Sequence, residues 1–330
     1  MKILKLTIAI PTYNRAEFLY QNLLMILKEI ETIGEQVDIV VSDNASTDHT
    51  EAMINDIVKE NPSVFYHRNN TNLGMDRNAD LAVQLSRGEY VLLLGDDDIL
   101  ESGALAEILH CLSVHPDIGI IYSNFRSYNV SLDERVELRD TAFDPIERNT
   151  YFADGMVVLE TTEKIFAAIS GGVYLRRLWL QASPERFFDS IFIHVGVTLD
   201  ILCRARAPAY LFKQPIFKYR LNVIGTGKIK CFEDIFAVSF GLLGILTAHK
   251  QYLSDRLFKK MYIKELHWTR QKILGAKARE DVPIIETLKQ MRSCYDTSRL
   301  DFWTVDIPIL LIPRWLLRAP YRLYRMLKYR

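Results

Sequence analysis

Three consecutive aspartates, Asp96, Asp97 and Asp98, are the residues of this chain whose type and spacing best suit chemistry. They follow, after one glycine, the apolar run at 90–94, whose length and β-rich content predict a buried strand. Carboxylates so close together repel one another and are costly to desolvate, and a divalent cation offsets that repulsion. Oxygen-rich sites of this kind suit Mg²⁺ or Mn²⁺. The alternative is a solvated acidic turn that caps a helix beginning near Ser102.

Three other polar segments could contribute to the same site. Residues 11–15 (Pro-Thr-Tyr-Asn-Arg) follow the first predicted strand, and residues 42–48 (Ser-Asp-Asn-Ala-Ser-Thr-Asp) follow the second. The third, Asn-Leu-Gly at 72–74 with Arg77, precedes the acidic strand. Gly74 would let the backbone approach a phosphate, and Arg77 could pair with that phosphate bidentately. Otherwise Arg77 is a solvated helix residue.

The scaffold for these segments is an alternation of strand and helix patterns through the first 125 residues. The predicted strands lie at 3–10, 37–41, 64–67, 90–94 and 118–123. The predicted helices lie at 18–30, 50–60, 77–86 and 105–112. Such alternation implies a mostly parallel sheet covered on both faces. Ligands of such folds bind beyond the carboxyl ends of the strands, so the polar segments are expected to converge on one crevice.

The patterns change beyond residue 125. Residues 126–165 are polar and irregular, which predicts a lid or insertion, and 163–169 predict a short helix before the break at Ser170-Gly171-Gly172. From about residue 222 onward the patterns are helical, at 232–248, 256–274 and 284–295. We therefore expect a catalytic domain at 1–221 and a helical region at 222–330.

With four motifs in this order and spacing, the chain resembles the inverting glycosyltransferases of family 2, which use nucleotide-sugar donors and have the GT-A fold. The resemblance covers about residues 3–125 and is thinner from 170 to 220. It implies an α/β fold with a mixed, mostly parallel central sheet. It also implies that Asp43 and Asn44 recognise the base, and that the nucleoside is rimmed by Pro11, Thr12, Tyr13 and Arg15. An ordinary turn with Asp48 as a helix cap is the alternative.

The acidic motif fits the family in two registers. In the Asp-x-Asp register, which we favour, Asp96 and Asp98 hold Mn²⁺ or Mg²⁺ and Asp97 belongs to donor binding. If Gly95 instead takes the place of the family's first aspartate, Asp97 becomes the principal ligand and Asp96 the ribose contact. The metal would neutralise the diphosphate leaving group as a Lewis acid. Gly172 matches the small-residue turn beside donor sugar and acceptor, or else is a simple strand-entry turn.

After that turn the family normally has an acidic pair whose aspartate deprotonates the acceptor hydroxyl. This chain instead reads Phe-Ile-His-Val at 192–195, with Asp189 before it and Asp200 after it. His194, with an ordinary pKa near 6.5, and Asp189 are the candidate bases. The alternative for His194 is a packed histidine on an apolar helix, and the departure leaves an inverting or retaining outcome open. The Gly-Asp-Asp-Asp and Phe-Ile-His-Val segments are also similar to those of dideoxyhexose transferases, such as abequosyltransferases of O-antigen synthesis.

Composition narrows the class of protein. Lys and Arg number 41 and Asp and Glu also number 41, so the net charge gives no argument for a nucleic-acid partner. The four cysteines lie far apart with no metal-finger spacing, which indicates a reducing compartment. The N-terminus lacks the features of a signal peptide, and no window reaches about 18 uninterrupted apolar residues. We expect a cytoplasmic protein that does not cross the membrane.

The C-terminal tail is basic. Residues 307–330 contain no acidic residue. Four arginines are spaced to form one stripe of a helix beside apolar and aromatic residues: Arg314, Arg318, Arg322 and Arg325. A helix of this kind suits the anionic surface of a membrane, which predicts peripheral attachment to the inner face of the cell membrane. The alternative is a surface helix docked on its own domain.

The sequence therefore predicts a metal-dependent glycosyltransferase. The expected donor is a UDP-, CDP- or dTDP-linked sugar, and the expected acceptor is a saccharide on a polyprenyl carrier. A sugar nucleotidyltransferase is one rival, but it would carry a glycine-rich basic loop after the first strand, which 11–15 is not. A catalytically degenerate binding protein is the other, kept open by the missing acidic base.

Overall fold

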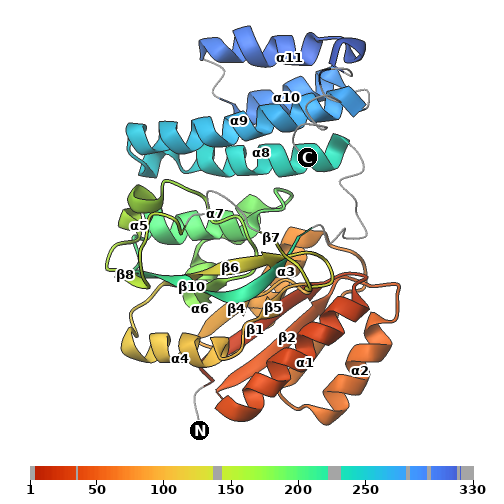
Figure 1. The fold of residues 1–330 in the computed structure, drawn as a ribbon, viewed down its shortest axis with the longest axis vertical. Coiled ribbons are helices and arrows are strands. Elements are labelled where there is room, and N and C mark those ends of the chain that lie inside the picture. The colour runs from red at the N-terminus through yellow and green to blue at the C-terminus, as the bar shows by residue number, and fades with distance from the viewer. Residues whose placement is uncertain are drawn as a thin grey trace. The chain divides into compact units, whose positions relative to one another are not determined.

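A computed structural model of the chain describes residues 4–34, 36–136, 143–221, 232–279, 283–295, 299–317 and 320. They form two compact units. The first comprises Met1–Phe188 with Ile193–Thr226, and the second Asp189–Phe192 with Gly227–Arg330. The first unit is a sheet with helices on its faces, and the second is helical (Figure 1).

The first unit is built on a sheet with the strand order β3-β2-β1-β4-β9-β6-β10-β5. Its first four strands are parallel: β1 (Leu6–Thr12), β2 (Val37–Asp43), β3 (Val64–Arg68) and β4 (Tyr90–Leu93). The predicted strands at the first four sites are thus confirmed, although β1 and β2 each run two residues further than expected. Every residue of β2 and β4 is buried, as expected for strands covered on both faces.

Four helices connect or follow these strands: α1 (Ala16–Ile33), α2 (Thr50–Glu60), α3 (Met75–Leu85) and α4 (Ala104–Val114). Right-handed crossovers and the reversal of strand order after β3 put α1 and α2 on one face of the sheet and α3 on the other. Figure 1 shows α1 and α2 side by side. The apolar period of α1 is the reason for its packing, because Leu19, Leu23, Ile26 and Ile30 all face the core.

The second half of the sheet is mixed: as in the mixed sheet that the resemblance implies, it contains both parallel and antiparallel strand pairs. The antiparallel strand β9 (Gly172–Leu175) lies between β4 and β6 (Ile120–Tyr128), and β10 (Ala209–Arg220) runs parallel to β6. Three short strands complete it: β5 (Ile99–Leu100), β7 (Arg135–Val136) and β8 (Thr150–Phe152).

The expected helix at 163–169 is wrong. The helix lies earlier in the chain, as α5 (Gly155–Thr162). Asp154 caps its first turn by accepting a hydrogen bond from the Met156 N–H at 2.9 Å. Glu163 then ends α5 in the left-handed region, with φ 51°. The remaining short helices of the first unit are α6 (Arg176–Gln181), η1 (Pro184–Phe187), α7 (Ile193–Leu199) and the π-helix η2 (Asp200–Arg204).

The second unit is helical, as predicted. Its elements are α8 (Phe232–Ala248), η3 (Lys250–Tyr252), α9 (Asp255–Arg279), α10 (Ile284–Cys294), the π-helix η4 (Phe302–Asp306) and α11 (Ile307–Leu311). Within the described parts of the chain, every helix is too short or too polar to span a bilayer. The predicted basic stripe lies largely outside these parts: Arg314 is described, whereas Arg318, Arg322 and Arg325 are not.

Candidate active site

The site lies where the strand order reverses, between β1 and β4. Ligands of open α/β sheets bind in the crevice at such a switch point. Thr12 ends β1 directly opposite Asp43, which ends β2, and the acidic loop Gly95–Asp98 follows β4. Three of the predicted polar segments, at 11–15, 42–48 and 95–98, therefore lie at the same edge of the sheet, as expected.

Arg15 and Thr12 hold the acidic loop. The Arg15 Nη1 donates to Asp96 Oδ1 and to Asp97 Oδ2, both at 2.9 Å, and the Thr12 hydroxyl donates to Asp96 Oδ2 at 2.7 Å. Two carboxylates thus share one guanidinium, so the chain itself supplies a cation that offsets their repulsion. The divalent cation expected from the sequence is thus not the only positive charge that these carboxylates can meet.

The three aspartates differ in their exposure to solvent. Asp96 and Asp98 are buried, whereas the Asp97 side chain is 18% exposed. Burial raises the pKa of Asp96 to about 6, although Arg15 opposes this. Burial also raises the pKa of Asp98 well above its ordinary value. Asp97 is therefore the carboxylate that a ligand can reach most directly.

Asp98 ties three parts of the chain together. Its Oδ1 accepts the backbone N–H of Arg220 at 3.1 Å, and its Oδ2 accepts the Ser170 hydroxyl. Ser170 in turn accepts the Gly95 N–H at 2.9 Å. Both oxygens of Asp98 are thus engaged in holding the loop to β10 and to the turn before β9. This geometry favours the second register, in which Asp97 and not Asp98 is the principal ligand.

The acidic loop does not cap the following helix. The N–H groups of Gly103, which precedes α4, and of Leu105 in its first turn donate instead to the Glu29 carboxylate at 2.8 and 3.1 Å. The short strand β5 separates the acidic loop from α4. The interpretation as a solvated, helix-capping turn is therefore wrong.

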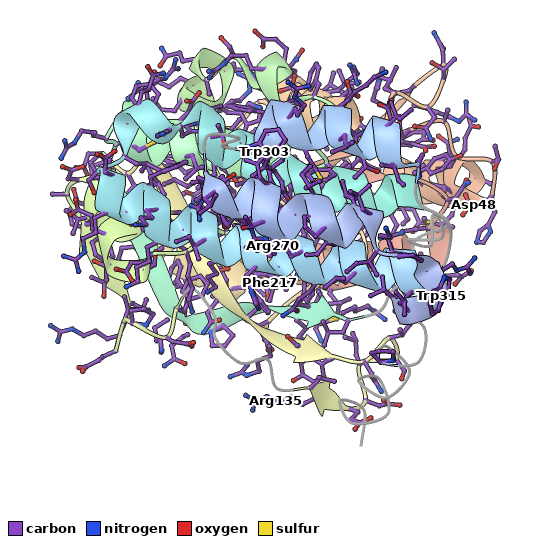
Figure 2. All side chains as sticks on the ribbon, turned by 90° about the horizontal axis from the view of Figure 1, so that it is seen from above. Asp48, Arg135, Phe217, Arg270, Trp303 and Trp315 are labelled. Carbon is purple, nitrogen blue, oxygen red and sulfur yellow. The ribbon has the colours of Figure 1, made fainter. Side chains whose placement is uncertain are left out.

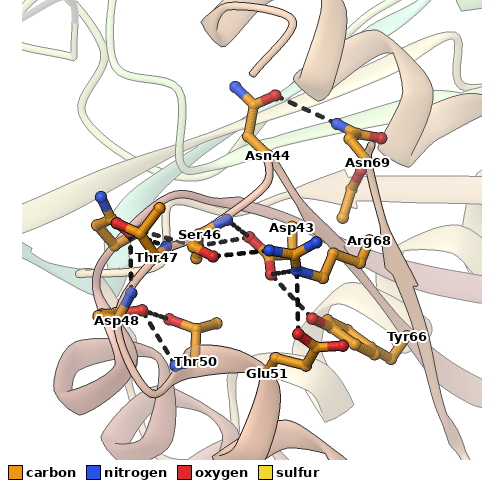
Figure 3. Close-up of polar contacts among 12 residues, drawn as sticks. Asp43, Asn44, Ser46, Thr47, Asp48, Thr50, Glu51, Tyr66, Arg68 and Asn69 are labelled. Atoms are coloured by element: carbon orange, nitrogen blue, oxygen red, sulfur yellow. Dashed lines mark hydrogen bonds and ion pairs between the residues drawn. The ribbon is translucent and has the colours of Figure 1, made fainter. Parts of the chain in front are cut away.

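Asp43 is fully buried and organises the loop after β2 (Figure 3). Its Oδ1 accepts the N–H and the hydroxyl of Ser46 at 2.9 and 2.5 Å, and its Oδ2 accepts the Tyr66 hydroxyl at 2.8 Å. Arg68 lies 3.7 Å from Asp43 and 3.3 Å from Glu51. Burial, together with the Asp43 carboxylate, raises the pKa of Tyr66. The fixed shape of the loop follows from these bonds.

Asn44 links the loop after β2 to the segment before α3. Its Nδ2 donates to Asn72 Oδ1 at 2.9 Å and to the Gly74 carbonyl at 3.2 Å, while its Oδ1 accepts the Leu73 N–H at 2.7 Å. Gly74 has φ 84°, a conformation that favours glycine. Arg77 is half-buried with its guanidinium 4.7 Å from the centre of the Phe188 ring, so it is not a fully solvated residue.

The loop after β1 is joined to the loop after β2 by Asn14. Its side-chain oxygen accepts the Thr47 N–H at 2.6 Å, and its own N–H donates to the Ser46 hydroxyl at 2.9 Å. Tyr13 beside it is partly buried, and Pro11 lies within β1. The predicted rim residues are thus held on one frame with Asp43 and Asn44.

The turn before β9 admits only glycine at its centre. Gly171 has φ 96°, and a Cβ there would lie 2.5 Å from the Phe217 ring and 2.7 Å from the Ser123 hydroxyl. Gly172 pairs with Leu93 across β4, which places it next to the acidic loop. The turn that the resemblance places beside donor sugar and acceptor therefore lies close to the acidic loop.

His194 is packed inside the first unit. Every residue of α7 is buried, and His194 is 1% exposed with its Nε2 3.0 Å from the Ala167 carbonyl oxygen. Burial lowers its pKa to about 4. Asp200 is also buried and forms ion pairs with Arg186 and Arg204. Asp189 has a left-handed backbone, with φ 66°, and belongs to the second unit.

The segment that contains this site also matches a known protein family. Residues 7–180, which contain all of the strand-end motifs, match the model of the family "Glycosyl transferase family 2". The chain belongs to glycosyl transferase family 2. That family assignment covers the parallel half of the sheet, the acidic loop and the turn before β9.

Two curated relatives resemble this family 2 chain over a limited length. The abequosyltransferase RfbV of Salmonella typhimurium is 41% identical over 115 residues, 34% of each chain. The GalNAc(5)-diNAcBac-PP-undecaprenol beta-1,3-glucosyltransferase of Campylobacter jejuni is 32% identical over 110 residues, 32% of this chain and 33% of its own. The matches span about a third of the length of these relatives.

Solved structures show the GT-A fold over nearly the whole chain. TarS residues 1–349 of S. aureus, in complex with UDP, superpose with a TM-score of 0.61 at 16% identity, covering 96% of this chain and 91% of that one. The mannosyltransferase PcManGT of Pyrobaculum calidifontis, in complex with GDP-Man and Mn²⁺, gives a TM-score of 0.55 at 16% identity, covering 98% and 88%. The predicted α/β GT-A architecture is confirmed.

The family 2 site also contains residues that the sequence analysis missed. Tyr66 and Arg68 contact Asp43, and Ser170 and Arg220 hold Asp98. Tyr66 lies within a predicted strand next to the second one, so the parallel order expected for the sheet could have indicated it. Arg220 gave no signal, because β10 was not predicted.

Proposed function

We propose that the chain transfers a sugar from a UDP-, CDP- or dTDP-linked donor to a saccharide on a polyprenyl carrier, as in O-antigen-like surface polysaccharide synthesis. The observation that carries this proposal is the junction at the switch point, where Thr12 and Arg15 join the nucleoside-facing loops to the acidic loop. The activities of the abequosyltransferase RfbV and of the Campylobacter jejuni glucosyltransferase support the choice of substrate classes.

In the proposed reaction the donor lies across the ends of β1, β2 and β4. Asp43 and Asn44 shape the pocket for the base, and the rim is formed by Pro11, Thr12, Tyr13 and Arg15. Gly74 and Arg77 would face the diphosphate, where an arginine pairs well with phosphate oxygens. The small turn at Gly172 would leave room for the sugar.

Mn²⁺ or Mg²⁺ fits the donor set, which consists of carboxylate oxygens. Among the described residues, no group of three or more His, Cys, Asp or Glu side chains could hold a metal. Such ions are usually held by one or two carboxylates together with substrate phosphates, so this set fits a metal shared with the donor. Asp97 would be the principal ligand with Asp96 beside it, and the ion would act as a Lewis acid on the leaving diphosphate. Asp98 would keep the loop in place.

Two residues, His194 and Asp189, are the candidates for the general base that deprotonates the hydroxyl of the acceptor saccharide. His194 is neutral at neutral pH because burial lowers its pKa, but a base must also reach its substrate within hydrogen-bond distance. A side chain 1% exposed on an apolar helix does not meet that requirement. Asp189, a carboxylate like the base of the family, is the other candidate.

Thermal unfolding with nucleotides tests the proposal. A panel of nucleoside diphosphates should include one that raises the melting temperature in Mn²⁺ and raises it less in a chelator. Asp97→Asn should lose the metal-dependent part of this shift, whereas the exposed-surface control Asp56→Asn should retain it. A metal-dependent shift that survives in Asp97→Asn would contradict the assignment of that residue.

The rivals are separated by the products. A glycosyltransferase releases a nucleoside diphosphate from the nucleotide sugar, whereas a nucleotidyltransferase releases pyrophosphate from a nucleoside triphosphate. A binding protein binds nucleotide and releases neither. Failure to cleave any UDP-, CDP- or dTDP-sugar, with or without a lipid-linked saccharide, would overturn the proposed function.

We also propose that the protein works at the inner face of the cell membrane, through the basic tail at 307–330. The absence of acidic residues from this segment supports that location.

A further inference from the structure

We propose that one face of the C-terminal segment inserts into the interface of an anionic lipid membrane. We call the six exposed apolar side chains of this segment the C-terminal apolar face: Leu300, Trp303, Val305, Leu311, Trp315 and Leu316. The inference deepens the proposed function and rests on it for its biological sense, because a polyprenyl-linked acceptor is reached from a membrane surface. It identifies structured apolar contacts in addition to the basic tail.

The face is unusually apolar for the surface of a water-soluble unit. Leu300 is 77% exposed, Trp315 70%, Leu311 60% and Trp303 58%. A surface helix normally turns its apolar stripe inward and its charges outward. Large exposed apolar patches mark sites that bind proteins or membranes.

The acidic residues of the same segment are paired. Asp306 is 2% exposed and accepts hydrogen bonds from Arg270 Nε and Nη2 at 2.6 and 2.7 Å. Asp301 accepts from Arg270 at 2.8 Å and from Arg299 at 2.9 Å. Both acidic residues of 300–317 are thus paired with arginines of the same unit. Neither acidic residue of 300–317 is therefore left without a basic partner to repel anionic lipid.

The segment is fixed on α9, so the face exists before any membrane is met. Phe302, Asp306 and Leu310 are spaced four apart and are all buried. Lys277 of α9 donates to the Leu310 carbonyl, and Arg270 of α9 holds Asp306. Figure 2 labels Arg270 together with Trp303 and Trp315 on the helices of this unit. A preformed face loses little conformational freedom on binding.

An anionic membrane fits this face better than a second copy of the chain does. Tryptophan is the residue most typical of membrane interfaces, and two of the four in the chain are on the face. The sequence continues after Leu317 with five basic residues and no acidic one: Arg318, Arg322, Arg325, Lys328 and Arg330. A symmetric dimer would pair identical patches and bring these like-charged segments together. Anionic lipid would attract them.

Vesicle binding tests the inference with the full chain. Sedimentation with vesicles of phosphatidylcholine and phosphatidylglycerol should show binding, and Trp303→Ser/Trp315→Ser should weaken it by about tenfold or more, since each ring loses its apolar burial. Val114→Ser is the matched control, because Val114 is also apolar and 55% exposed but lies on α4. This control should bind like the wild type.

Brominated acyl chains separate insertion from electrostatic adsorption. They should quench the fluorescence of Trp303 and Trp315, so Trp303→Phe and Trp315→Phe should each reduce the quenching. Unchanged quenching in both variants, or equal binding of the double variant, would overturn the inference. A concentration-dependent dimer that the double variant abolishes would also overturn it. Donor cleavage is measured in parallel without vesicles, so that loss of the proposed activity and loss of membrane insertion are distinguished.

Discussion

At the scale of single residues, His194 is the position where burial and chemistry conflict most directly. A general base needs contact with its substrate, whereas this ring is enclosed in α7 and bonded to the Ala167 carbonyl. Its lowered pKa follows from the loss of water around the charged form. The same burial that argues against catalysis makes His194 a source of pH-dependent stability.

We expect His194 to make the protein acid-sensitive. In the unfolded chain its pKa is about 6.5, and in the folded chain about 4, so between these values only the unfolded state binds the proton. The stability contribution is therefore complete above pH 6.5 and falls as the pH drops through 4, by roughly 3 kcal/mol in total. Urea denaturation at pH 7 and pH 4.5 measures it.

The matched variant is His194→Gln, which can still donate a hydrogen bond to the Ala167 carbonyl but does not titrate. Its free energy of unfolding should fall less than that of the wild type over this pH range, and turnover of the folded variant should stay near that of the wild type. A turnover loss of about 10²–10⁴-fold with unchanged pH dependence would instead restore His194 as the base.

At the scale of elements, the turn before β9 determines the position of the acidic loop. Ser170 holds both Gly95 and Asp98, and Gly171 lies tightly against Phe217. Gly171→Ala should lower the free energy of unfolding by about 2–4 kcal/mol, from a backbone strain plus a steric clash. Gly103→Ala is the control, because Gly103 has a left-handed backbone with φ 82° but open space around its Cβ position, so it should cost only about 1 kcal/mol. The free energies of unfolding are measured by chemical denaturation. If both variants lose the same amount, the neighbours of Gly171 move aside and the steric clash does not contribute.

Elements also show where sequence reasoning succeeds and where it ends. The strands before Thr12, Asp43 and Asp96 were predictable because local apolar runs and strand-end polar residues suffice to define them. The insertion of β9 between β4 and β6 was not, because antiparallel pairing of residues so distant in sequence, such as Leu93 with Gly172, leaves no local pattern. The role of Asp98 depends on that insertion, since its partners Ser170 and Arg220 come from distant elements. The ion pairs of Arg15 with Asp96 and Asp97 were missed because they also join residues that are distant in sequence.

At the scale of the whole molecule, the proposed function requires a donor site and a contact with the membrane, and these lie in different units. The first contains the strand-end loops of the candidate active site, and the second contains the C-terminal apolar face. Activity on a soluble donor depends on the first, whereas access to a lipid-linked acceptor would depend on the second as well. Measuring both activities on one variant of the second unit separates these contributions.

Truncation after Leu317 provides that variant. Removing 307–330 would also remove Leu310, which is buried against α9, whereas ending at Leu317 keeps the apolar face and removes five basic residues. Each basic residue contributes roughly 1 kcal/mol at an anionic surface, and salt screens this attraction. The truncated protein should therefore bind anionic vesicles more weakly and with less dependence on salt, and should be slower on a lipid-linked acceptor while cleaving donor normally. Unchanged salt dependence of vesicle binding would show that the tail does not contact the membrane, and a parallel loss of donor cleavage would show that it supports the catalytic unit instead.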